Sequence, residues 1–260
     1  MSDSRVAVRT ILITGATGAI GGALARDWAA PDITLHLHGR NKATLEALGQ
    51  ICRDKGANVT LHSVDLTDEE ALFSWIDHLD DTTPIDLVVA AAGVNTHPVD
   101  EYGESWENIK PLLDINLVAP IALCNRLSPR MQKRGHGQLV LMSSLAGYYG
   151  LPITSAYSAS KAGIKAYGEG LRGWLAPHGV KVNVIMPGYV KSKMCDEMPG
   201  PKPFLWTPER ASEYIRKRLA KNKARISFPF PLNFGTWWLA VLPASLSQWI
   251  LGLMGYEDTH

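Results

Sequence analysis

Apolar runs and amphipathic segments alternate along most of this chain. Each apolar run is short and predicts a strand, at residues 10–16, 33–40, 58–67, 85–94, 137–144 and 180–188. Segments with the helical spacing of apolar positions lie between them, at residues 21–30, 42–56 and 68–79 and around Tyr157. The run at 85–94 is apolar without alternation, as expected for a strand that is covered on both faces.

This regular alternation predicts an α/β fold: a doubly wound parallel sheet, or Rossmann fold, with three α/β/α layers. Gly56 is expected to end the second helix, and Thr67, with Glu70 three residues later, to cap the third. The sequence shows no internal repeat, and no low-complexity linker before residue 190. We therefore expect one catalytic domain over residues 1–260, in which residues 194–260 form a substrate loop, a helix, a last strand and an apolar tail.

The end of the first strand is rich in glycine. The stretch "TGATGAIGG" places Gly15, Gly18, Gly21 and Gly22 between this strand and the next helix. Glycines let the backbone turn tightly and approach a pyrophosphate, and a helix start offers free N–H groups and the positive end of its dipole. The stretch therefore predicts a dinucleotide site, although such turns also occur for packing alone.

Polar residues follow the second and third strands. Gly39 and Arg40 stand where a site that prefers NAD usually has an acidic residue, and the guanidinium of Arg40 suits a 2′-phosphate, so NADP is favoured. Asp65 is placed equally well to meet an adenine amino group or to open the next helix. His36 and His38 share one face of a strand, but two histidines without further ligands do not predict a metal site.

The other strand ends supply further candidates. The fourth strand ends in "AAAG", where small side chains would let a cofactor lie against the backbone, and the sixth ends in a Pro-Gly turn. Ser144 ends the fifth strand, 13 residues before Tyr157. Tyr157 and Lys161 are four residues apart on one predicted helix, so both polar groups can reach the same ligand. Such a pair alone lies more often on a solvated helix surface. The candidate residues at the neighbouring strand ends favour a shared ligand site instead.

The composition narrows the function classes. A length of 260 residues with 46% hydrophobic and 20% charged residues is ordinary for a globular protein, and a formal charge of +1 gives no drive toward nucleic acid. The cysteines Cys52, Cys124 and Cys195 are widely spaced and fit reduced thiols. The start "MSDSRVAVRTILITG" lacks the features of a signal peptide, so a cytoplasmic location is expected.

With these residues in place, the chain resembles the short-chain dehydrogenase/reductase family, in its single-domain branch. The resemblance covers roughly residues 8–195. It rests on the glycine motif, on "SS" followed 13 residues later by Y-x-x-x-K, and on the Pro-Gly turn, in this order.

The resemblance implies roles for four residues. Tyr157 matches the general acid/base, and Lys161 matches the lysine that holds the nicotinamide ribose and lowers the pKa of the tyrosine. Ser144 matches the serine that hydrogen-bonds the substrate oxygen, and Asn116 the asparagine of a proton relay that supports the lysine. Cofactor contacts are expected at Gly15, Thr17, Gly18, Ala19, Ile20, Gly21, Arg40, Asn41, Asp65, Leu66, Ala91, Ala92, Gly93, Tyr157, Lys161, Pro187, Gly188 and Val190.

The chain departs from the family pattern in three places. Ala19 stands at the middle glycine of TGxxxGxG, and the stretch also satisfies TGxxGxxG, which is typical of a longer branch that acts on nucleotide sugars. Ala90 and Ala91 replace the asparagines of the fourth-strand motif, so their side-chain hydrogen bonds are absent. Arg40 lacks a second basic partner, because Gly18 stands where that residue often occurs.

The likeness fades from residue 194 onward. A proline-rich loop is expected first, then a helix over 207–223 with Thr207 as its N-cap, and then a last strand. Residues 226–256 carry no charge and include three tryptophans, whereas seven basic residues lie between Arg210 and Arg225. Subunit packing is the first interpretation of this tail, and a membrane surface or an apolar substrate entrance are the others. Pro243 and polar residues argue against a membrane-spanning helix.

The leading hypothesis is an oxidoreductase that transfers hydride between NADP(H), or alternatively NAD(H), and a carbonyl or secondary alcohol. A nucleotide-sugar epimerase or dehydratase is the second hypothesis, and the short chain argues against it. A redox sensor that only binds NAD(P) is the third, and it would have no need for the tyrosine acid. The expected partners are a small carbonyl or alcohol substrate and further copies of this chain in a homodimer or homotetramer.

Overall fold

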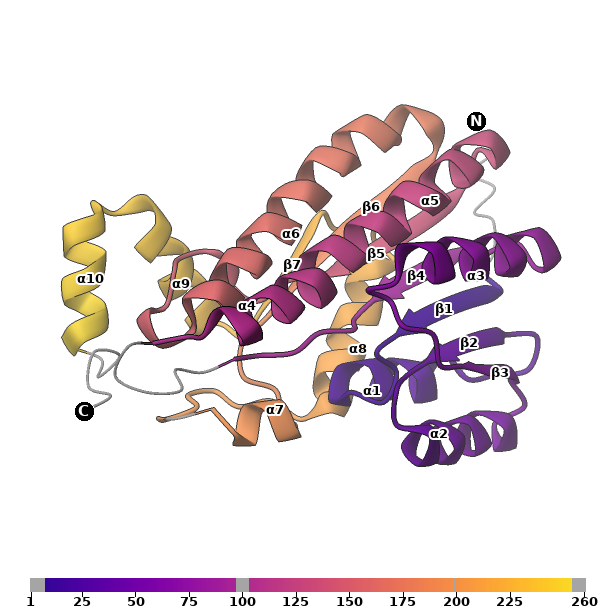
Figure 1. The fold of residues 1–260 in the computed structure, drawn as a ribbon, viewed down its shortest axis with the longest axis horizontal. Coiled ribbons are helices and arrows are strands. Elements are labelled where there is room, and N and C mark those ends of the chain that lie inside the picture. Colours follow the sequence, from indigo (N-terminus) through magenta and orange to yellow (C-terminus); the bar gives the residue numbers. More distant parts are fainter. Residues whose placement is uncertain (1–7, 97–102, 199, 254–260) are drawn as a thin grey trace.

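The computed structural model describes residues 8–96, 103–198 and 200–253. Seven described strands form one parallel sheet in the order β3-β2-β1-β4-β5-β6-β7 (Figure 1). The strands are β1 (Thr10–Thr14), β2 (Thr34–His38), β3 (Asn58–His62), β4 (Leu87–Ala90), β5 (Gly137–Met142), β6 (Val180–Pro187) and β7 (Arg225–Phe228). The predicted doubly wound parallel sheet is confirmed.

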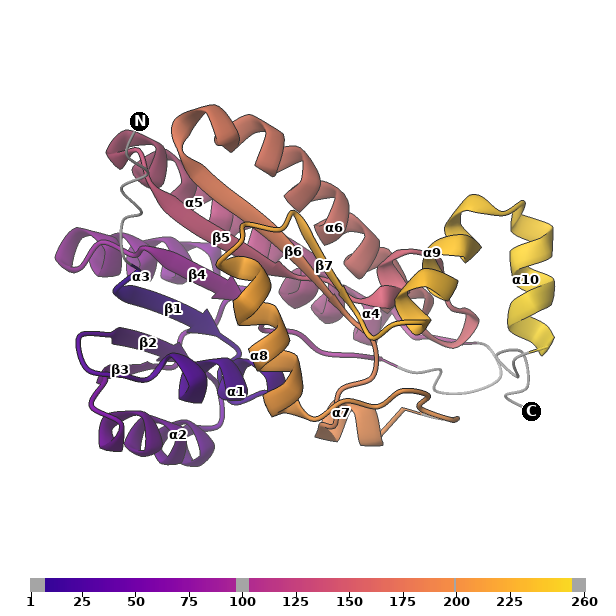
Figure 2. The same ribbon diagram turned by 180° about the vertical axis from the view of Figure 1, so that it is seen from behind.

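Helices cover both faces of the sheet (Figures 1 and 2). One face carries α1 (Ala19–Trp28), α2 (Lys42–Asp54) and α8 (Pro208–Leu219), and the other carries α3 (Glu69–Thr82), α5 (Ala119–Arg134) and α6 (Ser155–Leu175). The other described α-helices are α4 (Trp106–Leu113), α7 (Lys193–Asp196), α9 (Leu232–Val241) and α10 (Ala244–Leu253). Alternate side chains of β1 serve the two cores, because Ile11 and Ile13 pack with Leu24 whereas Leu12 packs with Ile76.

The order of the strands places a crevice beside β1. The chain builds outward from β1 through β2 and β3, and then returns to add β4 on the other side of β1. In such sheets ligands bind at the carboxyl ends of the strands, where the strand order reverses. Thr14 of β1 pairs with Ala90 of β4, so both strands end at the same level.

Two predicted helix caps have different outcomes. Thr207 caps α8 as predicted, since its hydroxyl accepts a hydrogen bond from the N–H of Arg210 at 3.3 Å. Thr67 as the cap of α3 is wrong: Asp68 caps this helix and accepts from the N–H of Ala71 at 3.0 Å. The Thr67 hydroxyl instead donates to Asp65 at 2.7 Å, so its side chain belongs to the turn that precedes the helix.

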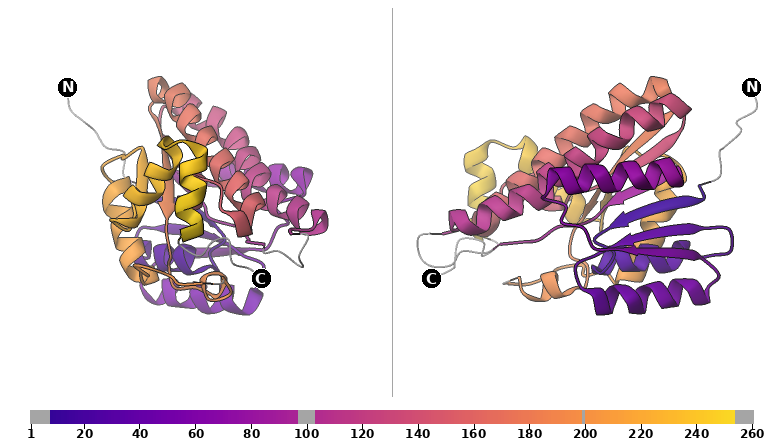
Figure 3. Two further views of the ribbon diagram at one scale, coloured as in Figure 1. Left: turned by 90° about the vertical axis from the view of Figure 1, so that its left-hand side faces the viewer. Right: turned by 45° about the vertical axis from the view of Figure 1, so that its right-hand side comes forward.

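The uncharged tail forms the hairpin of α9 and α10, which we call the tail hairpin (residues 232–253). It extends past the carboxyl ends of the strands (Figures 1 and 3). Within the described ranges, no helix combines the length and the apolar character needed to cross a membrane. Several basic residues that precede the tail have acidic partners, as in the pairs Arg216–Asp27 and Arg225–Glu169. Their charges are thus partly neutralised by the fold itself.

Candidate active site

A single large cavity runs along the carboxyl ends of the strands. Its volume is about 1030 Å³, and its wall extends from Gly15 after β1 to Leu251 on α10. The predicted cofactor residues that line it are Gly15, Thr17, Gly18, Ala19, Ile20, Gly21, Arg40, Asp65, Leu66, Ala91, Ala92, Gly93, Tyr157, Lys161, Pro187, Gly188 and Val190. The fold therefore brings the candidates from five strand ends and from α6 to one cavity.

Close backbone contacts shape the loop after β1. Gly15 has a φ of +66°, and a Cβ on it would lie 2.6 Å from the Cα of Ala92. A Cβ on Gly21 would lie 2.5 Å from the carbonyl oxygen of Gly15. Both positions thus require glycine. Gly18 is the N-cap of α1 and offers no side chain to the first turn, so the N–H groups of this turn are open to an anionic ligand.

The end of β2 packs against the loop that follows β1. A Cβ on Gly39 would lie 2.6 Å from the methyl carbon of Thr17, so a side chain at this position would collide with the loop. Arg40 follows, exposed and on the cavity wall, and it forms no salt bridge with the residues that the structure describes. Asn41, which we predicted to contact the cofactor, lies outside the wall, because its side chain caps α2 by accepting from the N–H of Thr44 at 3.0 Å.

The segment after β3 lies at the far end of the cavity. Asp65 accepts hydrogen bonds from the N–H of Thr67 at 2.9 Å and from its hydroxyl, and these bonds hold the pKa of the Asp65 carboxyl below its usual value. The carboxylate therefore stays ionised as an acceptor. His38 Nε2 donates to the carbonyl of Val64 at 2.8 Å and fixes the backbone beside Asp65.

The segment after β4 is supported by neighbours instead of its own side chains. The N–H of Ala92 donates to the hydroxyl of Thr14 at 3.3 Å. Asn116 is buried behind this segment, where its side chain accepts from the N–H of Val94 and donates to the carbonyl of Val94, both at 2.8 Å. These bonds provide the support that the missing asparagines of β4 cannot give. Asn116 lies outside the cavity wall, and its role in a proton relay stays a prediction.

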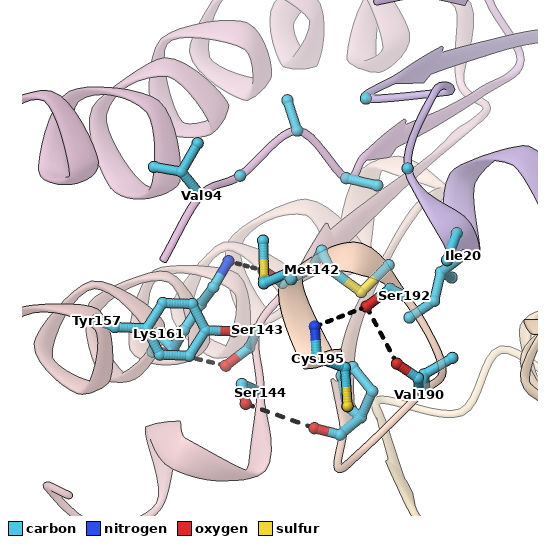
Figure 4. Close-up of a pocket in the computed structure, with 18 of the residues that line it drawn as sticks. Ile20, Val94, Met142, Ser143, Ser144, Tyr157, Lys161, Val190, Ser192 and Cys195 are labelled. Atoms are coloured by element: carbon cyan, nitrogen blue, oxygen red, sulfur yellow. Dashed lines mark hydrogen bonds between the residues drawn. The ribbon is translucent and has the colours of Figure 1, made fainter. Parts of the chain in front are cut away.

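Tyr157, Lys161 and Ser144 lie together on the cavity wall (Figure 4). Tyr157 and Lys161 stand one turn apart near the start of α6, and the Lys161 Nζ atom lies 5.4 Å from the centre of the Tyr157 ring. Lys161 Nζ also donates to the carbonyl of Met142 at 3.1 Å. Ser144 is the second residue after β5 and accepts from the N–H of Ala146 at 3.2 Å. The three polar groups therefore converge where β5 and α6 meet.

Burial controls the protonation of this group. It raises the pKa of the Tyr157 phenol, and a hydrogen bond with Ser144 lowers that pKa by less. Burial also lowers the pKa of Lys161 to about 8. The loss of solvent around the phenol thus outweighs its hydrogen bond with Ser144, and the expectation that Lys161 depresses the pKa of Tyr157 stays a prediction. At pH 7 Tyr157 keeps its proton.

Comparisons with known proteins agree with this geometry. The family model for short chain dehydrogenases matches residues 9–201. The chain is 35% identical to an uncharacterized oxidoreductase of Myxococcus xanthus, over 94% of this chain and 96% of that protein. It is 32% identical to a 3-oxoacyl-(acyl-carrier-protein) reductase of Rickettsia conorii, over 73% of this chain and 76% of that protein. This chain belongs to the short-chain dehydrogenase/reductase family.

The fold comparison points the same way. A short-chain dehydrogenase from Sphingobium yanoikuyae, solved in complex with NADPH, superimposes with a TM-score of 0.80, over 97% of both chains and at 24% identity. As a member of this family, the chain is an oxidoreductase. The cavity itself has features that suit a dinucleotide cofactor. It offers the glycine loop, the open first turn of α1, and small residues after β4 where a flat ring system could lie against the backbone.

The wall of this dehydrogenase beyond Tyr157 includes residues that the sequence did not single out. They come from the segment after Ser144, from α7 and its surroundings, and from the tail hairpin: Tyr149, Leu151, Met194, Met198, Leu232, Thr236, Leu239 and Leu251. No motif marks them, because apolar residues at helical spacing look the same in a core and in a substrate wall. The absence of charge in the tail is the one signal that set this segment apart.

Proposed function

We propose that this dehydrogenase reduces the carbonyl group of a small molecule, with NADPH as the preferred cofactor and Tyr157 as the proton donor. The observation that carries the proposal is the convergence of Tyr157, Lys161 and Ser144 on one wall of the cavity that begins at the glycine loop. The family match favours this reaction over the nucleotide-sugar epimerase, and the complete polar triad favours it over a redox sensor.

Tyr157 is placed to supply the proton of the reduction. Its phenol is protonated at neutral pH and can donate to a carbonyl oxygen as negative charge develops there. Ser144 stands beside the phenol and can donate a second hydrogen bond to the same oxygen. Bound NADPH supplies the hydride in this reaction.

The roles of Lys161 and Arg40 follow from their places on the wall. Lys161 is buried next to Tyr157, and its ammonium group would hold the ribose next to the nicotinamide and keep positive charge near the phenol after its proton has left. Arg40 lies beyond β2 at the other end, where a guanidinium would pair with a 2′-phosphate. An acidic side chain at position 39, the usual ribose partner in NAD sites, would collide with Thr17.

A direct assay tests the proposal. Purified protein is mixed with a panel of ketones and aldehydes, and the absorbance of NADPH or NADH is followed in parallel reactions. We expect turnover of at least one carbonyl class and a kcat/KM for NADPH at least about tenfold above that for NADH, as one charge-assisted pair would give. Turnover with NADH alone would disprove the cofactor preference, and turnover with neither would disprove the reductase.

A further inference from the structure

The cavity has two ends of different chemistry. Toward β1 and β2 its wall is formed by backbone turns and by polar or charged residues such as Thr17, Arg40 and Asp65. Beyond Tyr157 it continues into a space that we call the apolar chamber, lined by Tyr149, Leu151, Met194, Met198, Leu232, Thr236, Leu239 and Leu251. The whole cavity of about 1030 Å³ leaves room for a substrate body beyond the reacting carbonyl.

The apolar chamber offers little to a charged group. Apart from Lys161 beside Tyr157, Lys193 is the one charged residue near it on the described part of the wall. The Lys193 side chain is 91% exposed and lies 3.8 Å from Glu197. The hydroxyl of Thr236 donates back to the carbonyls of its own helix, with Leu232 O at 3.1 Å. A carboxylate or phosphate in this space would lose water without gaining a partner.

The tail hairpin is a fixed wall of this chamber. The Tyr149 hydroxyl donates to the carbonyl of Ala244 at 3.2 Å, which ties the turn between α9 and α10 to the segment after β5. Ser247 is fully buried and donates to the carbonyl of Leu239 at 2.8 Å, which holds the two helices together. Leu232 packs on Gly188, where an added Cβ would lie 3.0 Å from its Cδ2 atom. The hairpin therefore contacts the cofactor side of the site as well as the chamber.

The two helices of the hairpin face the chamber with specific leucines. Leu239 on α9 and Leu251 on α10 line the cavity and are almost completely buried. Two residues further along the same helices, Val241 and Leu253 lie on the outer side and are 52% and 70% exposed. Inward and outward apolar residues of the same helices can thus be compared directly.

From these observations we infer that the substrate is an uncharged carbonyl compound with a long or bulky apolar body, which the tail hairpin binds in the apolar chamber. This inference rests on the proposed carbonyl reduction and names its substrate class. Each methylene that enters an apolar wall improves binding about fourfold, until the chamber is full. The hairpin therefore sets specificity while Tyr157 performs the proton transfer.

The test is a series of methyl ketones whose alkyl group grows from ethyl to octyl, with NADPH oxidation as the readout. We expect kcat/KM to rise by a factor on the order of 10² or more along the series. The analogue of methyl octyl ketone in which a carboxylate replaces the terminal methyl group should react at least about tenfold more slowly than its parent. A flat series, or equal turnover of the carboxylate, would overturn the inference while the reductase stands. No turnover of any ketone by protein that binds NADPH would overturn the proposed function instead.

Matched variants assign the effect to the hairpin. Leu251→Ala and Leu239→Ala should reduce the ratio of kcat/KM between the octyl and ethyl ketones by about tenfold or more, because each removes apolar contact with the long chain only. Leu253→Ala and Val241→Ala change the outer side of the same helices and should leave this ratio within about twofold. The dissociation constant of NADPH, measured for every variant, shows that the fold is kept. An unchanged ratio in both inner variants with normal NADPH binding would contradict the assignment.

Discussion

Thr17 and Gly39 are in direct contact across the mouth of the cofactor site. A Cβ on Gly39 would lie 2.6 Å from the methyl carbon of Thr17, so the loop after β1 closes over the end of β2. Beyond the end of β2, the first side chain on the cavity wall is then that of Arg40. In the proposed cofactor site, this contact leaves no room for an acidic side chain at position 39. The basic side chain at position 40 is then the one placed to bind the 2′-position of the ribose.

Arg40→Ala should therefore weaken NADPH binding on the order of 10- to 100-fold, as expected when a charge-assisted hydrogen bond to a phosphate is lost. Binding of NADH, which lacks this phosphate, should change by less than about threefold. Both dissociation constants can be measured by titration of cofactor fluorescence. Lys42→Ala is the matched control, because Lys42 is exposed two residues later and lies outside the cavity wall. Equal losses for both cofactors would show that Arg40 does not select the phosphate.

Tyr157→Phe should lower kcat by a factor on the order of 10² or more, because the proton donor is removed while the ring still packs. The dissociation constant of NADPH should stay within about threefold. Tyr149→Phe is the matched control: its ring also lines the cavity, but its hydroxyl donates to Ala244. This variant should keep kcat within about fivefold, since one neutral hydrogen bond is lost far from the reacting oxygen. Full activity in Tyr157→Phe would rule out the proposed proton donor.

The cofactor end of the site could be predicted from the sequence, because its constraints act on the backbone. Gly15 and Gly21 are forced by contacts under 3 Å, and such contacts leave a recognisable pattern of residues. The same is true of Tyr157 and Lys161, whose spacing is fixed by one turn of α6. Motifs of this kind are local in the chain.

The rest of the site depends on contacts between segments that are far apart in the chain. No local sequence pattern predicts such contacts. The tail hairpin reaches the site through Tyr149 and Ala244, 95 positions apart. Asn41 lies outside the cavity wall and caps α2, because a position after β2 suits a helix cap as well as a cofactor contact, and its contact with the cofactor stays a prediction. The pKa of Tyr157 could not be foreseen either, since burial depends on the complete fold. Oligomeric state, cellular location and membrane contact of the tail stay predictions.

A cluster of three histidines on β2 and β3 should make the fold sensitive to acid. His36 Nδ1 lies 3.2 Å from His62 Nε2, and the indole of Trp75 donates to His62 Nδ1 at 3.1 Å. Burial lowers the pKa of His36 and of His38, and burial with the neighbouring histidines lowers the pKa of His62 from 6.5 to about 4. The folded state thus disfavours the charged form of all three rings.

The sign of the effect follows from linkage. Between pH 6.5 and about 4, His62 is protonated in the unfolded chain but neutral in the folded chain. The free energy of unfolding is therefore highest above pH 6.5 and decreases as the pH drops through this window. We expect the melting temperature to decrease between pH 7 and pH 5, and His62→Gln to flatten this decrease even if it lowers stability overall. His78→Gln, at an exposed position of α3, is the control and should leave the slope unchanged. An identical slope in His62→Gln would exclude the cluster as the cause.

Glu104 caps the N-terminus of α6, the helix that carries Tyr157, in place of a side chain from the N-cap residue itself. The N-cap residue of α6 is Thr154, whose side chain makes no capping bond. Glu104, from outside this helix, accepts from the N–H of Ala156 at 2.8 Å, and its other oxygen accepts from the hydroxyl of Thr96 at 2.5 Å. A carboxylate at this place satisfies an orphan N–H and meets the positive end of the helix dipole. It also ties residue 96 to the turn that precedes Tyr157.

Glu104→Ala should therefore lower the free energy of unfolding by about 1–2 kcal/mol, as expected for a lost helix cap. Because Tyr157 follows Ala156 directly, we also expect kcat to fall several-fold while the dissociation constant of NADPH changes little. Glu104→Gln keeps an acceptor oxygen but loses the charge, so both effects should be intermediate. Glu107→Ala removes the same side chain from an exposed position in the first turn of α4. It should leave kcat unchanged and lower the free energy of unfolding by no more than about 0.5 kcal/mol. Denaturant unfolding and steady-state kinetics on the four proteins test the two effects separately: a loss of stability with unchanged kcat would make Glu104 a cap only, and would contradict its role in positioning Tyr157.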